Sequence, residues 1–475
     1  MGVGPITPES AETLAEDAAF LSQFQPGIGA AFFGASPSAS AAVNTAGLQA
    51  LADWCATNKV TGYMAAGTYQ INDTLDLQKV PRYGLVGQGI GITILEQTTN
   101  NIPVIEIGAV GASEANSIQV SGMTIRHSTN QAAANTSAIG IKFSAEVYFG
   151  TFTNLFFERS AYGMYCGANG TPWATTFDNL DFGGDISVAA VDFSSATTAG
   201  PNQRWGRVGV NFTSMTGNAM NMFGSTITIE NIEFFCTPGS AGPARLFKLN
   251  QGYCSVGAMS VENGVWGSGA ILFDVLAAQL TVDQFRIFSV TLTGTPNPVY
   301  LFRGGAGGAQ GHIEVRKLSA AAASITGEGV CAQLDLSAPA TFRVGTILLS
   351  NGWTLQSTGY STSAARCHVA EWANGQLAAN KGDASYAFAV GDPTIVPFNT
   401  TFTAQRTVTL PANASNNLFS GLAVKIITDG AVNGANTLVI KDGSTTLRTE
   451  TNDKRALTYT YRRNAWVLTG YETLP

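Results

Sequence analysis

Charged side chains are scarce in this sequence. Lysine, arginine, aspartate and glutamate together supply 12% of its 475 residues, about half of the usual fraction. The net charge of −7 argues against a general nucleic-acid binder, because such proteins need a basic surface. No apolar run approaches the roughly 20 residues of a membrane-spanning helix, so we expect no membrane insertion. The acidic start, with Glu9, Glu12 and Glu16, is unlike a signal peptide.

Cysteine and histidine are also few. The six cysteines are scattered without C-x-x-C spacing, and the three histidines stand apart from one another. Cys367 and His368 are adjacent, but no second ligand pair has the spacing of a zinc site. We therefore expect buried or reduced thiols, no disulfide framework, no metal site and no cofactor.

Glycine is abundant, with 53 residues, alongside serine, threonine, asparagine and alanine. Hydrophobic residues make up 45% of the chain, which is enough for a sizeable core and excludes a disordered protein. The length suggests about three domains, although elongated β architectures run longer as one unit. The composition favours a long folded protein covered by small, neutral polar side chains.

Two short helices are predicted near the N-terminus. Residues 8–24 place leucine and alanine at helical spacing and end at a Pro-Gly breaker. Residues 45–58 have Thr45 as the predicted N-cap and an apolar stripe that includes Leu48 and Leu51. We expect the second helix to cap the structure that follows.

A short unit recurs between about residues 118 and 350. It consists of a polar or small residue, an apolar residue, any residue and a second apolar residue. Copies begin at Gly122, Asn154, Asn179, Asn231, Ala258 and Gln284, with looser copies at Lys317 and Thr346. They are about 25–33 residues apart, except for one interval of 52 that holds a degenerate coil near residues 205–212.

This repeat predicts a parallel β-helix, in which each coil carries about three short strands that stack on their copies in the next coil. The two apolar residues of each unit then point inward, and the residue between them points outward. Asn154, Asn179 and Asn231 stand just before the inward residue, where we expect a structural ladder of hydrogen-bonding amides rather than a sugar-binding site. Helical repeats are excluded, because no helix signal recurs with the unit.

The C-terminal part has a different pattern, typical of antiparallel strands with hairpin turns such as Asp442-Gly443. We interpret it as a compact β-sandwich. The predicted organisation is an N-terminal segment at 1–28, a β-helix body at 29–380 with its capping helix at 45–58, a linker at 381–397 and a β-sandwich at 398–475.

The segment at residues 33–89 resembles the start of a known fold family. Phe33-Gly34-Ala35-Ser36, the helix at 45–58, the strand Ala66-Gly67-Thr68-Tyr69 and the turn Leu85-Val86-Gly87-Gln88-Gly89 look like the first coil of pectate-lyase-like right-handed parallel β-helices. With a short N-terminal segment and a C-terminal β-sandwich, the whole layout resembles bacteriophage tailspikes.

The resemblance implies a homotrimer on the phage tail, which acts outside the host cell. Such a protein binds bacterial surface polysaccharide (capsule, exopolysaccharide or O-antigen) during adsorption, and many members cleave it as glycosidases or lyases. Residues 1–28 would attach to tail or baseplate proteins, and residues 398–475 would serve trimerisation or receptor binding. A binding-only or structural tail fibre and a secreted polysaccharide lyase remain the alternatives.

Glycoside hydrolysis generally needs two carboxylates, so we looked for acids in one outward column. Asp181 and Glu233 occupy the same position of the unit, and with one coil between them their backbones lie about 9.6 Å apart, near the inverting range. Glu230 and Glu262 are nearby alternatives. Three alternatives stay open: solvated surface acids, a lyase site with a basic residue such as Arg207 or Arg286, and a site between chains.

Four residues are candidates for substrate binding: Trp205, Arg207, Trp173 and Tyr165. Aromatic rings can stack on sugars, although they can equally cap turns or fill a seam between chains. Arg204 and Arg207 flank Trp205 and are compatible with an acidic polysaccharide.

Overall fold

The structure is a computed structural model. It describes residues 27–77, 83–108, 114–305, 310–320, 324–334, 340–349, 353–354, 366–372, 381–388, 395–410, 423–462 and 465–474. The helix predicted at residues 8–24 lies outside the described residues. The chain divides into two compact units, Met1–Val256 and Gly257–Pro475.

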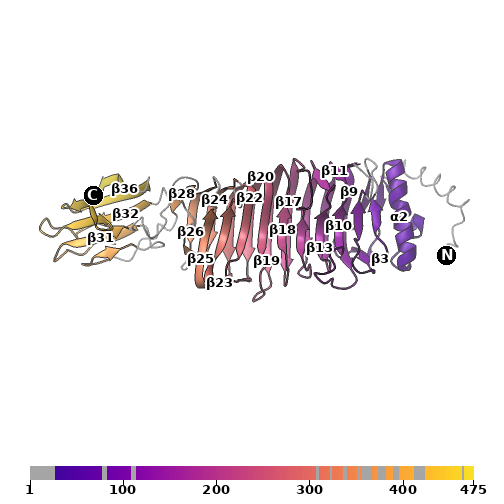
Figure 1. Cartoon of the computed structure of the whole chain (residues 1–475), viewed down its shortest axis with the longest axis horizontal. Coiled ribbons are helices and arrows are strands. Elements are labelled where there is room, and N and C mark those ends of the chain that lie inside the picture. Colours follow the sequence, from indigo (N-terminus) through magenta and orange to yellow (C-terminus); the bar gives the residue numbers. More distant parts are fainter. Residues whose placement is uncertain are drawn as a thin grey trace, which may run out of the picture. The chain divides into compact units, whose positions relative to one another are not determined.

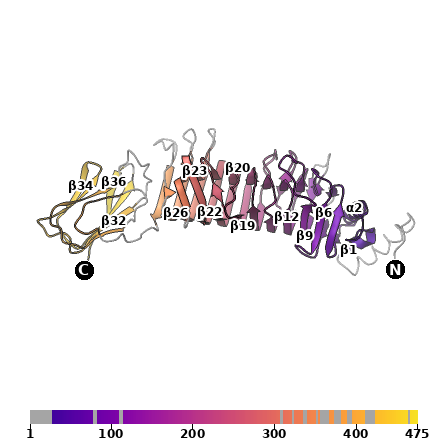
Figure 2. The same cartoon turned by 90° about the horizontal axis from the view of Figure 1, so that it is seen from below.

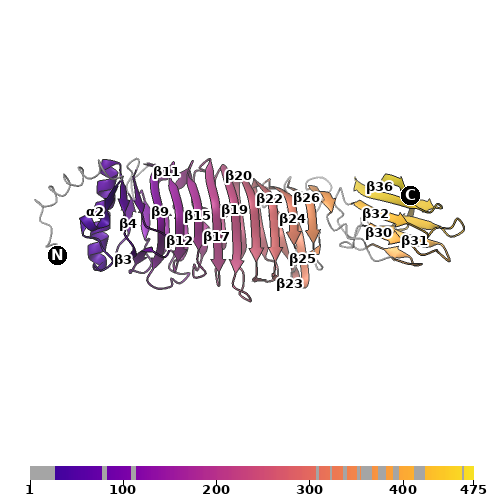
Figure 3. The ribbon, with the colours of Figure 1, turned by 180° about the vertical axis from the view of Figure 1, so that it is seen from behind.

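The first unit is a parallel β-solenoid whose strands pair coil on coil in three rows. The long-strand row contains β1 (Gly27–Gly29), β2 (Thr61–Tyr63), β3 (Gly67–Ile71), β5 (Tyr83–Val86), β6 (Thr93–Gln97), β9 (Ile118–His127), β12 (Thr151–Glu158), β15 (Thr176–Phe182), β17 (Gln203–Phe212) and β19 (Thr226–Cys236). Figure 3 shows β9, β12, β15, β17 and β19 of this row side by side.

The other two rows complete each coil. The short-strand row contains β4 (Leu75–Leu77), β7 (Ile105–Ile107), β10 (Ile139–Phe143), β13 (Tyr162–Cys166), β16 (Ala189–Asp192), β18 (Asn218–Met222) and the start of β20 (Arg245–Glu262). Figure 1 shows β10, β13 and β18 of this row. The third row contains β8 (Glu114–Asn116), β11 (Glu146–Tyr148) and β14 (Thr171–Trp173). The predicted parallel β-helix is confirmed.

The apolar residues of the repeated unit fill the interior of the solenoid. Leu155 and Phe157 are fully buried, and the residue between them, Phe156, is partly exposed. Equivalent rings stack from coil to coil: the centroid of Phe177 lies 5.3 Å from that of Phe152 and 4.0 Å from that of Trp205. The core is therefore a set of columns, each repeated at the spacing of the strands.

Asparagines mark a corner within the long strands. Asn154 and Asn179 have φ angles of 54° and 48°, a left-handed conformation that asparagine tolerates better than most residues. Asn179 Nδ2 donates to Asn154 Oδ1 at 2.7 Å, which confirms the amide ladder for this pair. The next position along this corner is Arg207, in register with Asn231 of the following coil.

Helix α2 (Ala41–Asn58) lies across the first coil and covers its end (Figure 2). It follows the short 3-10 helix η1 (Ala30–Phe33) and buries Leu48, Leu51 and Cys55 against the solenoid. It begins earlier than predicted: Ser40 is the N-cap, and Thr45 lies inside the helix with its hydroxyl donating to Ala41 O. Among the described residues, no helix is long and apolar enough to span a membrane.

The second unit begins with further parallel coils. Their strands are the end of β20, β21 (Val265–Trp266), β22 (Ile271–Phe288), β23 (Thr291–Gly304), β24 (His312–Ala320), β25 (Ser324–Leu334), β26 (Thr341–Leu349), β27 (Trp353–Thr354) and β28 (Arg366–Trp372). β22 pairs with β24, β24 with β26 and β26 with β28 in parallel register.

The C-terminal part of this unit consists of two four-stranded sheets. One contains β29 (Tyr386–Ala387), β31 (Arg406–Leu410), β33 (Leu438–Asp442) and β34 (Thr445–Glu450), and the other contains β30 (Ile395–Phe398), β32 (Ala423–Thr428), β35 (Arg455–Arg462) and β36 (Ala465–Thr473). Side chains of both sheets, including Val408, Ile426 and Leu457, form one hydrophobic core, so the sheets make a sandwich.

Two details of this sandwich differ from the predictions. The strands are not all antiparallel: β29 with β31, β31 with β33 and β30 with β32 pair in parallel, because successive strands often switch sheets. Within the described part of the sandwich, the sequential antiparallel pairs are β33 with β34, across Asp442-Gly443, and β35 with β36. Moreover, β29 lies within residues 381–397 and β30 begins there, so the sandwich begins inside the range predicted as a linker.

We predict that protonation of His127 destabilises the fold. His127 is fully buried, its Nε2 donates to Ile102 O at 3.0 Å, and burial lowers its pKa. The unfolded chain therefore binds more protons, and stability falls as the pH drops below about 6.5. Denaturant unfolding at a series of pH values measures this loss.

The matched variant is His127→Gln, because Gln97 occupies the equivalent buried position in the preceding coil. This variant should lose the part of the pH dependence that His127 causes. An unchanged pH profile in His127→Gln contradicts the prediction.

Candidate functional site

The outward column of the long-strand row carries the predicted carboxylates. Thr124, Phe156, Asp181, Gly209 and Glu233 are in register on successive strands from β9 to β19. β17 lies between the strands of Asp181 and Glu233, which confirms the predicted coil between them. Two strand spacings separate their backbones by about 9.6 Å.

Asp181 is held over the neighbouring strand by two features. Its Oδ2 lies 3.2 Å from Arg207 Nη1, and the same nitrogen donates to Asn179 Oδ1 at 3.0 Å. On the next strand, a Cβ added to Gly209 would lie only 2.3 Å from Asp181 Oδ1. The absence of a side chain at Gly209 therefore lets the Asp181 carboxylate lie over β17, on the side of Glu233.

Glu233 differs from Asp181 in having no such support. It is partly exposed, and within the described part of the chain its carboxylate has no hydrogen bond or ion pair. A carboxylate with free oxygens can hydrogen-bond to a ligand or exchange a proton with it. The column thus combines one fixed and one free carboxylate.

The two alternative acids lie in other surroundings. Glu230 forms an exposed ion pair with Arg204 at 2.8 Å. Glu262 lies at the end of β20 in the second unit, where it is partly exposed and has a contact of its own. Glu233, in contrast with Glu230 and Glu262, combines free carboxylate oxygens with a position in the same column as Asp181.

The prediction that Trp205 binds substrate is wrong. Its side chain is fully buried and stacks on Phe177 inside the solenoid, where no ligand on the surface can reach it. The alternation of the strand explains this, because exposed Arg204 faces outward and its neighbour must face inward. Arg207, in contrast, is on the surface with 53% of its side chain exposed.

Trp173 and Tyr165 lie on other rows than Asp181. Trp173 is in the third row, where its ring stacks on Tyr148 with centroids 5.4 Å apart. Tyr165 is in the short-strand row, and its hydroxyl forms a 2.8 Å hydrogen bond with Ser195 Oγ. The structure does not place these two aromatic residues in the Asp181 column, and their role in substrate binding stays a prediction.

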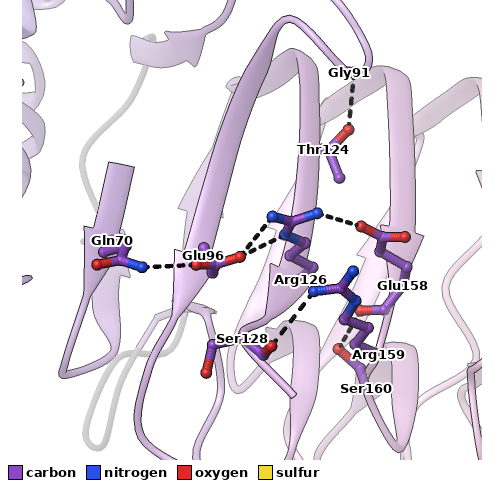
Figure 4. Close-up of polar contacts among 9 residues, drawn as sticks. All are labelled: Gln70, Gly91, Glu96, Thr124, Arg126, Ser128, Glu158, Arg159 and Ser160. Atoms are coloured by element: carbon purple, nitrogen blue, oxygen red, sulfur yellow. Dashed lines mark hydrogen bonds and ion pairs between the residues drawn. The ribbon is translucent and has the colours of Figure 1, made fainter. Parts of the chain in front are cut away.

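The long-strand row has a second charged column, which the sequence analysis did not identify. Figure 4 shows Arg126 between Glu96 and Glu158, with Arg126 nitrogens 2.6 Å and 2.8 Å from the two carboxylates. Gln70 Nε2 also donates to Glu96 Oε1 at 2.9 Å. These carboxylates are already satisfied by partners from adjacent coils, so the column stabilises the stack and leaves little capacity for a ligand.

The short-strand row carries a polar column that the sequence also signals. Single polar residues between apolar ones recur in register on successive strands: Glu106, Lys142, Tyr165, Asp192 and Asn221. Lys142 Nζ lies 2.9 Å from Glu106 Oε1, and Asn221 Nδ2 donates to Asp192 Oδ1 at 3.0 Å. The apolar-polar-apolar triplets, such as Ile105-Glu106-Ile107, were the signal that could have found it.

Within the described ranges, no group of three metal-ligating side chains comes together. Cys55, Cys166, Cys236 and Cys254 are free and buried, and burial raises the pKa of the Cys166 thiol. A raised pKa keeps a thiol protonated, and a protonated thiol is a poor nucleophile.

No protein-family model matches the sequence, and no curated protein matches it. Among solved structures, the Agl-KA catalytic domain is 13% identical with a TM-score of 0.40, over 72% of this chain and 68% of that chain. The catalytic unit of a GH87 alpha-1,3-glucanase from Streptomyces thermodiastaticus is 12% identical with a TM-score of 0.43, over 73% and 68%. Similarity at this level carries no information on activity.

We predict that Gly209→Ala damages the site without damaging the fold. The new Cβ collides with Asp181 Oδ1, so the carboxylate must move away from its place over β17. Displacement of a reacting group by about 1 Å can lower a rate about 100-fold. The measurements are polysaccharide cleavage and thermal unfolding.

The matched control is Gly267→Ala, because a Cβ there first meets another atom at 4.0 Å. Equal activity of the Gly209→Ala and Gly267→Ala proteins would show that the position of the Asp181 carboxylate is irrelevant.

Proposed function

We propose that the protein binds and hydrolyses a bacterial surface polysaccharide, with Asp181 and Glu233 as the catalytic carboxylates. The observation that carries this proposal is their common column, with a fixed carboxylate and a free one two coils apart. Inverting glycosidases hold their carboxyl groups about 6.5–9.5 Å apart, with room for a water molecule between base and sugar.

The two carboxylates have different roles in this mechanism. Asp181, oriented by Arg207, takes a proton from water as the water oxygen bonds to the anomeric carbon. Glu233, whose oxygens are free, gives its proton to the glycosidic oxygen as the bond from that oxygen to the anomeric carbon breaks. The products are two shorter saccharides, and the new reducing end has the inverted configuration.

The biological setting of the proposal is a phage tailspike. It is supported by the segment at residues 33–89, which resembles pectate-lyase-like β-helices, together with the C-terminal sandwich. In this setting residues 1–28 dock on tail or baseplate proteins, the sandwich serves trimerisation or receptor binding, and the protein acts as part of the virion outside the cell.

The alternatives have distinct products. A binding-only tail fibre adsorbs the polysaccharide and releases no reducing ends. A secreted lyase also releases reducing ends, but each cleavage leaves an unsaturated sugar that absorbs ultraviolet light. Both assays use the same purified polysaccharide, so one experiment separates the three functions.

We predict that Asp181→Asn and Glu233→Gln each lower hydrolysis by about 100- to 10,000-fold, the usual contribution of a general acid or base. Reducing-end release measures the effect, and thermal unfolding shows that the fold is retained. Glu230→Gln is the comparison, because Glu230 is the alternative acid. Normal hydrolysis by Asp181→Asn or Glu233→Gln, or loss only in Glu230→Gln, refutes the assignment.

We also predict that the full chain forms a trimer. Light scattering coupled to gel filtration should give three times the chain mass of 49.5 kDa. A monomer at micromolar concentration would contradict the tailspike setting but not the assignment of the carboxylates.

A further inference from the structure

The charges around the Asp181 column are not balanced. β15, β17 and β19 carry two cations and four carboxylates on their outer side: Arg204, Arg207, Asp178, Asp181, Glu230 and Glu233. They are the only charged residues of these three strands. A ligand that lies across the strands therefore meets more negative than positive charge.

Both arginines are already paired. Arg204 lies 2.8 Å from Glu230, and Arg207 lies 3.2 Å from Asp181. The carboxyl groups without a cation partner are those of Asp178 and Glu233, and Glu233 carries a proton in the proposed mechanism. Asp178 Oδ1 accepts the backbone N–H of Asn179 at 2.9 Å and that of Arg207 at 3.1 Å, whereas Glu233 has no partner within the described ranges.

The remaining positions of the column are uncharged. Phe156, on the strand before Asp181, is partly exposed, and Gly209 has no side chain. An aromatic ring next to carboxylates suits a sugar whose C–H groups contact the ring and whose hydroxyls donate to the carboxylate oxygens. No unpaired cation on these strands is left to receive an acidic group.

We propose that the Asp181 and Glu233 site takes polysaccharides of neutral sugars and rejects those with uronate residues. The inference rests on the proposed function, and it names the substrate class of that site. Even with Glu233 protonated, as its role of general acid requires, the three strands carry three carboxylates and two cations, so a uronate carboxylate there meets net negative charge and no unpaired cation. The inference also replaces the expectation that Arg204 and Arg207 favour an acidic polysaccharide, because both arginines form ion pairs with carboxylates of the protein.

The same charges disfavour elimination chemistry at this site. A lyase removes the proton beside a uronate carboxylate, and the electron pair that remains expels the glycosidic oxygen. Because negative charge builds up on the carboxylate, this step is favoured by an unpaired cation next to it. Arg204 and Arg207 are the only cations of β15, β17 and β19, and both are paired.

The test uses matched pairs of polysaccharides. Each uronate-bearing polysaccharide in a panel is compared with its carboxyl-reduced form, in which the uronates have become neutral hexoses. Affinity electrophoresis at low salt measures retention. Reducing-end release measures total cleavage, and ultraviolet absorbance measures elimination, so the difference between the two is hydrolysis. We expect at least 10-fold stronger retention and faster hydrolysis of the neutral form.

A charge variant sharpens the test. Glu230→Gln frees Arg204 and removes one negative charge, so the preference for the neutral form should shrink several-fold. The control is Asp283→Asn, which breaks another exposed ion pair, that of Asp283 with Arg316 at 3.1 Å, and should leave the preference unchanged.

The outcomes separate the inference from the proposed function. Retention of neutral forms without hydrolysis upholds the inference and refutes hydrolysis. Equal or better retention or cleavage of the uronate forms overturns the inference, and the function stands if Glu233→Gln abolishes that cleavage. Failure to retain any neutral polysaccharide of the panel also overturns the inference.

Discussion

The hydrogen-bonded register between successive coils is the constraint on which the rest of this structure depends. Parallel strands stack about 4.8 Å apart, so a residue in one coil lies directly beside its counterpart in the next. Side chains of the core and of the surface are therefore arranged in columns that run from coil to coil. Phe152, Phe177 and Trp205 form such a column inside, and Phe156, Asp181, Gly209 and Glu233 form one outside.

This constraint also explains how a chain with few charges builds charged clusters. In a column, like charges would repel at the strand spacing, whereas opposite charges and amides pair. Glu96, Arg126 and Glu158 alternate in sign, and Asn154 and Asn179 share a hydrogen bond. Glu233 departs from this pattern, because its neighbour in the preceding coil is Gly209 and its carboxylate has no partner among the described residues.

The repeat of the sequence sufficed to predict the β-helix, the amide pair and the register of Asp181 with Glu233, because apolar pairs at each coil define the inward positions. The repeat did not suffice to place Trp205 in the core. Its coil lacks the asparagine that marks the corner in other coils, and the flanking Arg204 and Arg207 suggested a surface position. The support of Asp181 by Gly209 also escaped prediction, because a close approach across strands appears only in three dimensions. In the sandwich, strand order depends on packing of two sheets, which local alternation does not encode.

The central claim is that two carboxylates separated by one intervening coil act as an inverting pair. The most direct measurement is the anomeric configuration of the first-formed product, followed by proton NMR before mutarotation, with any polysaccharide that the protein cleaves. The backbones of Asp181 and Glu233 lie about 9.6 Å apart, near the range of inverting carboxyl pairs, so we predict inversion. Retention of configuration requires carboxyl groups about 5–5.5 Å apart and would contradict the account.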